Sequence, residues 1–171
     1  MRRGLLVAAC FALLLVAPGS AGNDKQEPTD GCLVVENGQG IVTVSARGGI
    51  FGRFDSGSVI IEDLVPNDTK GPKVFNAPDV VRLGDTKIQY TGLNVRFRFT
   101  SGGSFRVRVH AVGIDLSAIG RGWATLRGSD ELGAFTDPGT YSADEASLCA
   151  KGFKPLPEKP VRIVLGAAGN P

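Results

Sequence analysis

Five basic side chains recur at alternating positions in the middle of the chain, where they could bind an anion. They are Arg96, Arg98, Arg106, Arg108 and His110. Planar guanidinium groups form paired hydrogen bonds to phosphate, sulfate and carboxylate groups. We therefore predict an anion-binding face built from these residues. The alternative is that the long side chains extend into solvent or pair with acids on neighbouring strands, as exposed arginines commonly do.

The segment from Asn94 to Ala111 predicts a β-hairpin, because apolar and polar residues alternate on both sides of a Gly-Gly pair. We favour a three-residue loop of residues 101–103 with Gly103 in the left-handed conformation, since it sets apolar residues opposite one another. The predicted pairs are Phe99 with Phe105, Phe97 with Val107, and Val95 with Val109. This register also sets Arg98 opposite Arg106 and Arg96 opposite Arg108. Like charges in that arrangement destabilise a sheet unless something offsets them.

A small secreted hydrolase built on His110, the single histidine, is the alternative function. Asp115 is near enough in sequence to orient the imidazole, and the neighbouring arginines favour a neutral histidine that can act as a base. The sequence contains no Gly-x-Ser-x-Gly nucleophile elbow. We therefore assign no catalytic residue and prefer a non-enzymatic binding or structural module. Two cysteines and one histidine are too few ligands for a zinc site, so we expect neither metal nor cofactor.

The first 21 residues predict a signal peptide. Two arginines precede an apolar run from Leu5 to Ala17, and a stretch of small residues ends at Ala21, after which cleavage is expected. The mature protein would then be secreted or extracytoplasmic. The apolar run is too short for a stable membrane span, and no second candidate appears, so we expect a soluble product.

Charge gives no general support for nucleic-acid binding. The chain has 19 Lys plus Arg and 17 Asp plus Glu, and two of the arginines but no acid lie in residues 1–21, which leaves 17 against 17. A mature chain of zero net charge must owe any anion preference to local clustering. We expect an anionic cell-surface polymer or a protein as partner, and no nucleic acid.

The cysteines predict one disulfide. Cys10 leaves with the signal peptide, so only Cys32 and Cys149 remain in the mature chain. Two cysteines in an exported protein favour a single bridge. It would join the first strand of the domain to a segment near its end and act as a structural staple.

Composition and turn residues predict one all-β domain over residues 32–165, after a flexible linker at 22–31 and before a disordered tail at 166–171. Short strand-like runs are separated by Gly, Pro, Asn and Asp, which is typical of a β-sandwich of about ten strands, immunoglobulin-like or jelly-roll-like. Besides the hairpin, the predicted strands are Cys32–Val35, Ile41–Ala46, Ile50–Phe54, Ser58–Leu64, Val80–Leu83, Lys87–Tyr90, Trp123–Arg127, Thr140–Ser142 and Val161–Leu165.

A weak internal duplication is also visible. A shift of 65 residues lays Val42–Asp63 over Val107–Gly128 without a gap, so that Gly48 matches Gly113 and Gly57 matches Gly122. Alternation in Gly-rich strands produces such matches by chance, and a true repeat of two related strand units is the other interpretation.

Four stretches of the sequence together resemble a family of uncharacterised secreted bacterial proteins. They are Gly52-Arg53-Phe54, Gly57 to Asp63, Pro66-Asn67-Asp68, and Val109 to Gly122. The resemblance covers most of the mature chain. It implies export and a β-rich fold, and it implies no activity and no site.

Overall fold

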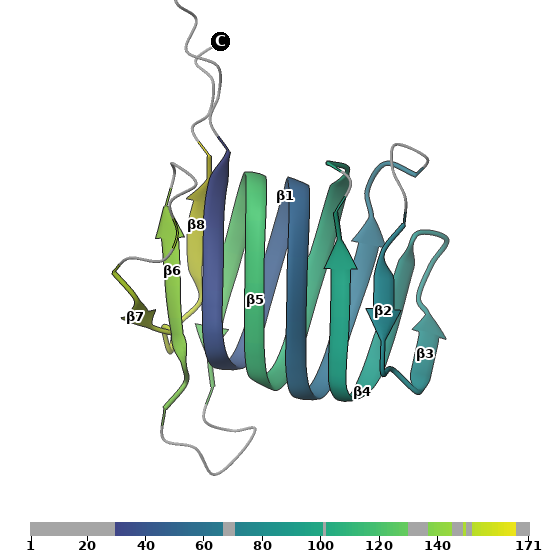
Figure 1. Cartoon of the computed structure of the whole chain (residues 1–171), viewed down its shortest axis with the longest axis horizontal. Coiled ribbons are helices and arrows are strands. Elements are labelled where there is room, and N and C mark those ends of the chain that lie inside the picture. The colour runs from purple at the N-terminus through teal and green to yellow at the C-terminus, as the bar shows by residue number, and fades with distance from the viewer. Residues whose placement is uncertain are drawn as a thin grey trace, which may run out of the picture.

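The computed structural model describes residues 30–66, 71–100, 102–129, 137–144, 149 and 152–166. In these residues the protein is all-β, as predicted, and its eight strands form one open antiparallel sheet (Figure 1). This part of the chain has no helix that is long and apolar enough to cross a membrane. The predicted signal peptide lies outside the described residues, as do residues 22–29 of the predicted linker and 167–171 of the predicted tail.

Three long strands make up most of the sheet: β1 (Gly31–Asp63), β4 (Lys87–Phe99) and β5 (Ser104–Gly128). Five short strands complete it: β2 (Lys73–Phe75), β3 (Asp79–Arg82), β6 (Thr140–Asp144), β7 (Lys154–Pro155) and β8 (Val161–Leu165). The described residues thus contain eight strands rather than about ten, because the four strands predicted between Cys32 and Leu64 lie along the 33-residue β1. An immunoglobulin-like or jelly-roll-like sandwich stays a prediction.

Strands β1 and β5 wind around each other. Ile41 of β1 pairs with His110 of β5 on one side and with Arg127 of β5 on the other. These two partners are 17 residues apart, so β5 makes one complete circuit between them. In Figure 1 the β1 and β5 ribbons pass alternately in front of the molecule and behind it.

The winding divides the sheet into two layers, which we name from the view in Figure 1. The front layer contains residues 31–36 and 49–54 of β1, 114–119 of β5 and 95–99 of β4, with β2, β6 and β7 at its edges. The back layer contains residues 41–47 and 58–63 of β1, 104–111 and 122–128 of β5 and 87–91 of β4, with β3 and β8 at its edges.

Glycines occupy the corners where β1 passes between the layers. Gly48 and Gly57 have φ angles of +154° and +143°, which residues with a side chain rarely adopt. A Cβ at Gly48 would overlap the carbonyl oxygen of Ile119, and one at Gly57 would overlap that of His110. The paired strands can therefore bend together without losing their register only because these positions carry no side chain.

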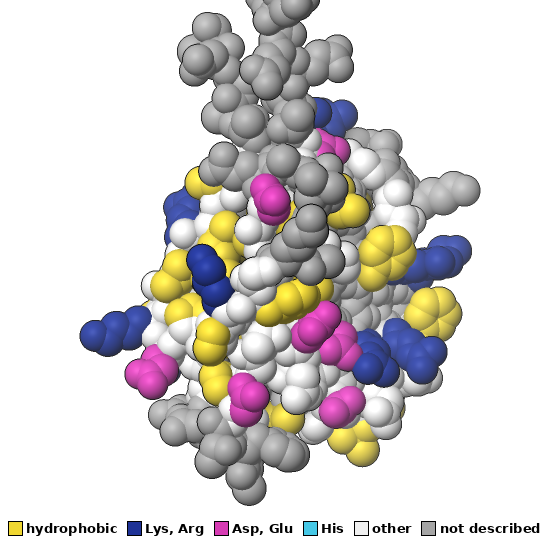
Figure 2. Space-filling model, turned by 60° about the vertical axis from the view of Figure 1, so that its left-hand side comes forward, with side chains coloured by type: hydrophobic (Ala, Val, Ile, Leu, Met, Phe, Trp, Pro, Cys, Tyr) yellow, Lys and Arg dark blue, Asp and Glu magenta, His cyan; other side chains and the backbone are white. Residues whose placement is uncertain are grey.

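The hydrophobic core lies between the two layers. Inward-facing residues of both layers meet there, and the rings of Phe99 and Phe105 contact each other with centroids 5.3 Å apart. The largest fully buried apolar side chains are Phe54, Phe99, Phe105, Leu33, Ile50, Ile114, Leu126 and Leu165. Charged side chains are spread over the outer surface among scattered hydrophobic ones (Figure 2).

The predicted hairpin of residues 94–111 is wrong in its pairing. Strand β4 pairs with β1, β2 and β3, and β5 pairs with β1 and β8, so the two strands are not neighbours. Strand β4 instead ends at Phe99 in the front layer and β5 begins at Ser104 in the back layer, and Gly102 rather than Gly103 is left-handed, with φ +73°. The burial pattern was nevertheless right, since Val95, Phe97, Phe99, Phe105, Val107 and Val109 are all buried.

The two segments of the suspected duplication follow similar courses. Each begins in the back layer, passes through the front layer and returns to the back layer. Gly48 and Gly57 of the first segment, and Gly113 and Gly122 of the second, lie at or beside these crossings, and all four have positive φ angles. A common origin of the two segments stays a prediction.

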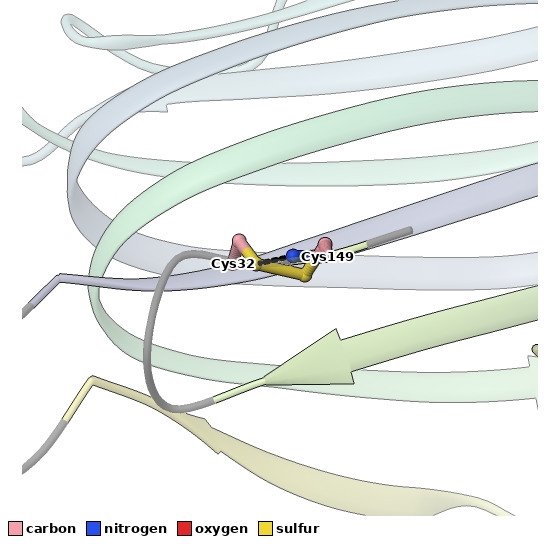
Figure 3. Close-up of a disulfide and its surroundings, with 2 residues drawn as sticks. All are labelled: Cys32 and Cys149. Carbon is pink, nitrogen blue, oxygen red and sulfur yellow. Dashed lines mark hydrogen bonds between the residues drawn. A yellow bond between two sulfur atoms is a disulfide. The ribbon is translucent and has the colours of Figure 1, made fainter. Parts of the chain in front are cut away.

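A disulfide joins Cys32, the second residue of β1, to Cys149, as the sequence predicted. The two Cα atoms are 5.8 Å apart, and the Cys149 backbone N–H donates a hydrogen bond to Cys32 Sγ at 2.8 Å (Figure 3). The bridge spans 117 residues of sequence and so closes nearly the whole domain into one loop.

The corner glycines give a first testable prediction. Gly57→Ala should lower the free energy of unfolding in urea by about 3 kcal/mol, because it adds backbone strain and a steric overlap in the sheet. Gly84→Ala is the matched control, since a Cβ there would meet only Lys87 Cβ at 3.8 Å. Equal losses in the two variants would contradict the role assigned to the corner.

The disulfide gives a second prediction. Replacing both Cys32 and Cys149 with serine should lower the free energy of unfolding by about 4 to 5 kcal/mol, because a loop of this length restricts the unfolded chain strongly. Urea unfolding of the oxidised wild type and of the double variant measures the difference. An unchanged unfolding midpoint would show that the bridge is not a staple.

Candidate functional site

An open groove of about 1170 Å³ runs across the outer face of the front layer. Pockets for small ligands usually measure about 300–1,000 Å³. The groove is lined by residues of β1, β4 and β5 and by the end of β2, so it crosses several strands. Its size and its course suit an extended ligand better than a compact one.

Three neighbouring strands place six outward side chains beside this groove. Each strand contributes two residues, which alternate with residues that face the core. Strand pairing aligns the six residues in two rows across the sheet. The first row is Phe51, Arg98 and Lys73, and the second row is Arg53, Arg96 and Phe75. We call these six residues the front-layer grid. Both phenylalanines are about half exposed, at 53% and 52%.

The end of β2 is held against β4 by asparagines. Asn76 donates a hydrogen bond from Nδ2 to the backbone oxygen of Asn94 at 3.1 Å. Both residues have left-handed φ angles, +61° and +52°, which asparagine tolerates better than most residues. This contact keeps the neighbouring Phe75 beside Arg96 in the front-layer grid.

Arg53 forms the closest ion pair of the site. Its Nη2 and Nε lie 2.6 and 2.8 Å from Asp115 Oδ2, while Asp115 Oδ1 accepts a hydrogen bond from the Asn37 backbone N–H at 2.9 Å. The hydrogen bond to Asp115 and its negative charge raise the pKa of Arg53 above its ordinary value. Arg53 is therefore fully charged at any pH at which the protein would work.

The groove has an acidic end and a basic end. Glu36, Asp55 and Asp115 line it on the side of β1 and β5, and Arg96 and Arg98 line it on the side of β4. Among the described residues, Arg96 and Arg98 make no ion pair. In Figure 2, where the front layer is turned to the right, dark blue and yellow side chains gather along the right-hand margin with magenta ones beside them.

The five residues of the predicted anion-binding face do not share one face. Arg96 and Arg98 point outward from the front layer, whereas Arg106, Arg108 and His110 belong to the back layer. The predicted oppositions of Arg98 to Arg106 and of Arg96 to Arg108 are therefore wrong. The reason is that both strands bury their apolar sides in the same core but approach it from opposite layers.

The three back-layer residues have neighbours of their own. Arg106 Nη1 lies 3.3 Å from Glu62 Oε2 in an exposed ion pair. Arg108 lies between Thr43 and Ile60, and His110 between Ile41 and Ser58. A further arginine of this layer, Arg162, stacks on the ring of Trp123 at 4.6 Å from its centroid.

The structure does not bring His110 and Asp115 together. His110 lies in the back layer and Asp115 in the front layer, with the crossing at residues 112–113 between them. Asp115 is engaged by Arg53 and by the Asn37 amide instead. The geometry therefore gives Asp115 no role in orienting the imidazole.

Sequence reasoning missed Phe51, Arg53, Lys73 and Phe75. The two residues of β1 had a local signal, because Phe51 and Arg53 alternate with the buried Ile50 and Phe54, whereas Lys73 and Phe75 join the site only through the pairing of β2 with β4. An aromatic residue at an outward position beside an arginine is the local pattern that could have identified the site.

No group of three or more His, Cys, Asp and Glu side chains that could hold a metal ion occurs in the described ranges. No protein-family model, no curated protein and no solved structure matches the chain. The resemblance to a family of secreted bacterial proteins thus stays a prediction, and the site is interpreted from its own geometry.

The Arg53–Asp115 ion pair gives a third prediction. Asp115→Asn should lower the free energy of unfolding by no more than about 1 kcal/mol, because exposed ion pairs contribute little. The loss should shrink at high salt, since salt screens the repulsion that then remains between Arg53 and Arg96.

Asp30→Asn is the matched control, because Asp30 forms a similar exposed pair with Arg121 at 3.1 Å but has no place in the front-layer grid. Urea unfolding at low and high salt measures both variants. A loss of several kcal/mol in Asp115→Asn, or a loss that salt leaves unchanged, would contradict this account of the pair.

Proposed function

We propose that the protein is a non-enzymatic binding module that holds an anionic ligand in the front-layer groove. The proposal rests on one observation: two pairs of positively charged side chains lie directly opposite each other on neighbouring strands. Arg96 lies directly opposite Arg53, and Arg98 directly opposite Lys73. Such pairs destabilise a sheet, and in the part of the chain that the structure describes an acid, Asp115, forms an ion pair with only one of the four cations. An anion bound among them would offset the rest.

The side chains suit such a ligand chemically. Arginine presents a planar fork of donors that matches carboxylate, sulfate and phosphate groups, and it does not lose its charge. Arg96 and Arg98 are exposed, and neither guanidinium group forms an ion pair with an acid in the described residues. An anionic polymer at the cell exterior, or an acidic protein surface, presents such groups in series along the groove.

An exported location is part of the proposal. The Cys32–Cys149 disulfide supports it, because such bonds persist mainly in oxidising compartments. The basic and apolar pattern of residues 1–21 supports it as well. Binding outside the cytoplasm would expose the groove to cell-surface polymers.

The test compares arginine pairs from the two layers. Arg96→Ser/Arg98→Ser should weaken binding of dextran sulfate at least tenfold, whereas Arg106→Ser/Arg108→Ser, which removes equal charge from the back layer, should leave it nearly unchanged. Binding should fall with added salt, because the attraction is electrostatic. Neutral dextran serves as the uncharged probe, and titration calorimetry provides the dissociation constants.

Two outcomes would overturn the proposal. One is equal weakening by the two double variants, which would mean that only overall charge matters. The other is an absence of salt-sensitive binding by the oxidised wild type.

A further inference from the structure

We infer that the groove binds an acidic oligosaccharide, with Phe51 and Phe75 packing on sugar rings and the arginines between them holding the acidic groups. This inference rests on the proposed function, since it names the ligand class of the same site. It adds a role for the two exposed aromatic residues, which anion binding alone does not need.

The register of the sheet places the two rings at opposite corners of the front-layer grid. Phe51 lies in β1 and Phe75 in β2, with β4 between them, and they are two positions apart along the strands. Strand spacings near 4.8 Å and rises near 3.3 Å put their Cα atoms about 12 Å apart. Arg98 and Arg96 lie on β4, between the two rings.

A ligand that uses all of these groups must offer apolar faces at two places and acidic groups between them. A pyranose ring has a face of C–H groups that buries apolar area on an aromatic ring, and a rim of hydroxyls that need hydrogen-bond partners. Uronate or sulfate substituents supply the anions for the guanidinium forks. A linear acidic oligosaccharide combines these features in a repeating order.

The acidic end of the groove fits the hydroxyl groups of such a ligand. Glu36 and Asp55 line the groove, are exposed and form no ion pair within the described residues. Ionised carboxylates only accept hydrogen bonds. They can therefore receive sugar hydroxyls that extend beyond the basic part of the site.

The same carboxylates disfavour duplex nucleic acid and polyphosphate. Charges in these polymers are closely spaced, about one per 1.7 Å of axis in duplex DNA, and their affinity comes chiefly from charge neutralisation by Lys and Arg. A groove that sets Glu36, Asp55 and Asp115 beside its arginines repels part of so dense a charge. A galacturonate chain carries one carboxylate per sugar ring, so its charges lie farther apart and this repulsion is weaker.

The experiment measures binding of four probes to the oxidised protein by calorimetry. They are a galacturonic acid tetramer, a neutral maltotetraose, inorganic polyphosphate and an oligothymidylate. The expected order puts the galacturonate first. Phe51→Ser and Phe75→Ser should each weaken galacturonate binding about tenfold and should leave any residual polyphosphate binding unchanged.

Val164→Ser is the control for loss of an exposed apolar side chain, since Val164 is 57% exposed on β8 of the back layer. Urea unfolding of each variant shows that the fold is kept, and Phe51→Tyr, which retains a ring at this position, should bind like wild type. This rescue separates stacking from a general structural effect.

The outcomes of this experiment distinguish a wrong ligand class from a wrong binding function. Polyphosphate or oligothymidylate that binds at least as tightly as galacturonate, with binding lost in Arg96→Ser/Arg98→Ser, would overturn the oligosaccharide and leave the anion site standing, whether or not the phenylalanine changes weaken that binding. Equal binding of maltotetraose and galacturonate would overturn the acidic character of the ligand. Absence of all anion binding would overturn both.

Discussion

The structure depends on corners that carry no side chain. Strands β1 and β5 stay hydrogen-bonded to each other while both cross from one layer to the other, and five glycines at these corners lie directly against the backbone of the other strand: Gly40, Gly48, Gly57, Gly120 and Gly122. Glycine alone fits there, and its conformational freedom makes the unfolded chain costlier to order. The long loop closed by the disulfide offsets part of this cost by restricting the unfolded state. One constraint therefore explains the glycine-rich composition, the great length of two strands and the value of a covalent staple.

The groove is a product of the same winding. Because the long strands pass through both layers, residues distant in sequence become neighbours on one outer face, as Asp115 of β5 and Arg53 of β1 do. The front layer contains two arginines of β4 and the Arg53–Asp115 ion pair. It also contains two half-exposed phenylalanines, one on each of the two strands that flank β4. The back layer presents Arg106, already paired with Glu62, and a stacked Trp123. The outer faces of the two layers thus differ in how many of their cations are already paired.

Local patterns in the sequence predicted burial well and pairing poorly. Alternation identified the core side of residues 95–99 and 105–109, but it looks the same whether two strands pair side by side or face each other across a core. The spacing of glycines along β1 was visible in the sequence, because Gly31, Gly40, Gly48 and Gly57 follow at intervals of 9, 8 and 9 residues. Two successive intervals add up to 17 residues, which is the length of one circuit. For the site, Arg96 and Arg98 were found because they alternate with buried residues. Their partners Arg53 and Phe75 were not, because only the register between separate strands brings them together.

We propose the front layer of this wound sheet as the ligand-binding face. Mapping amide chemical-shift changes of the isotope-labelled, oxidised protein as the galacturonic acid tetramer is added would locate that face. The changes should be concentrated at residues 51–53, 73–75 and 96–98, with little response from residues 106–110 in the back layer. Changes centred on the back layer, or spread evenly over both layers, would contradict this proposal.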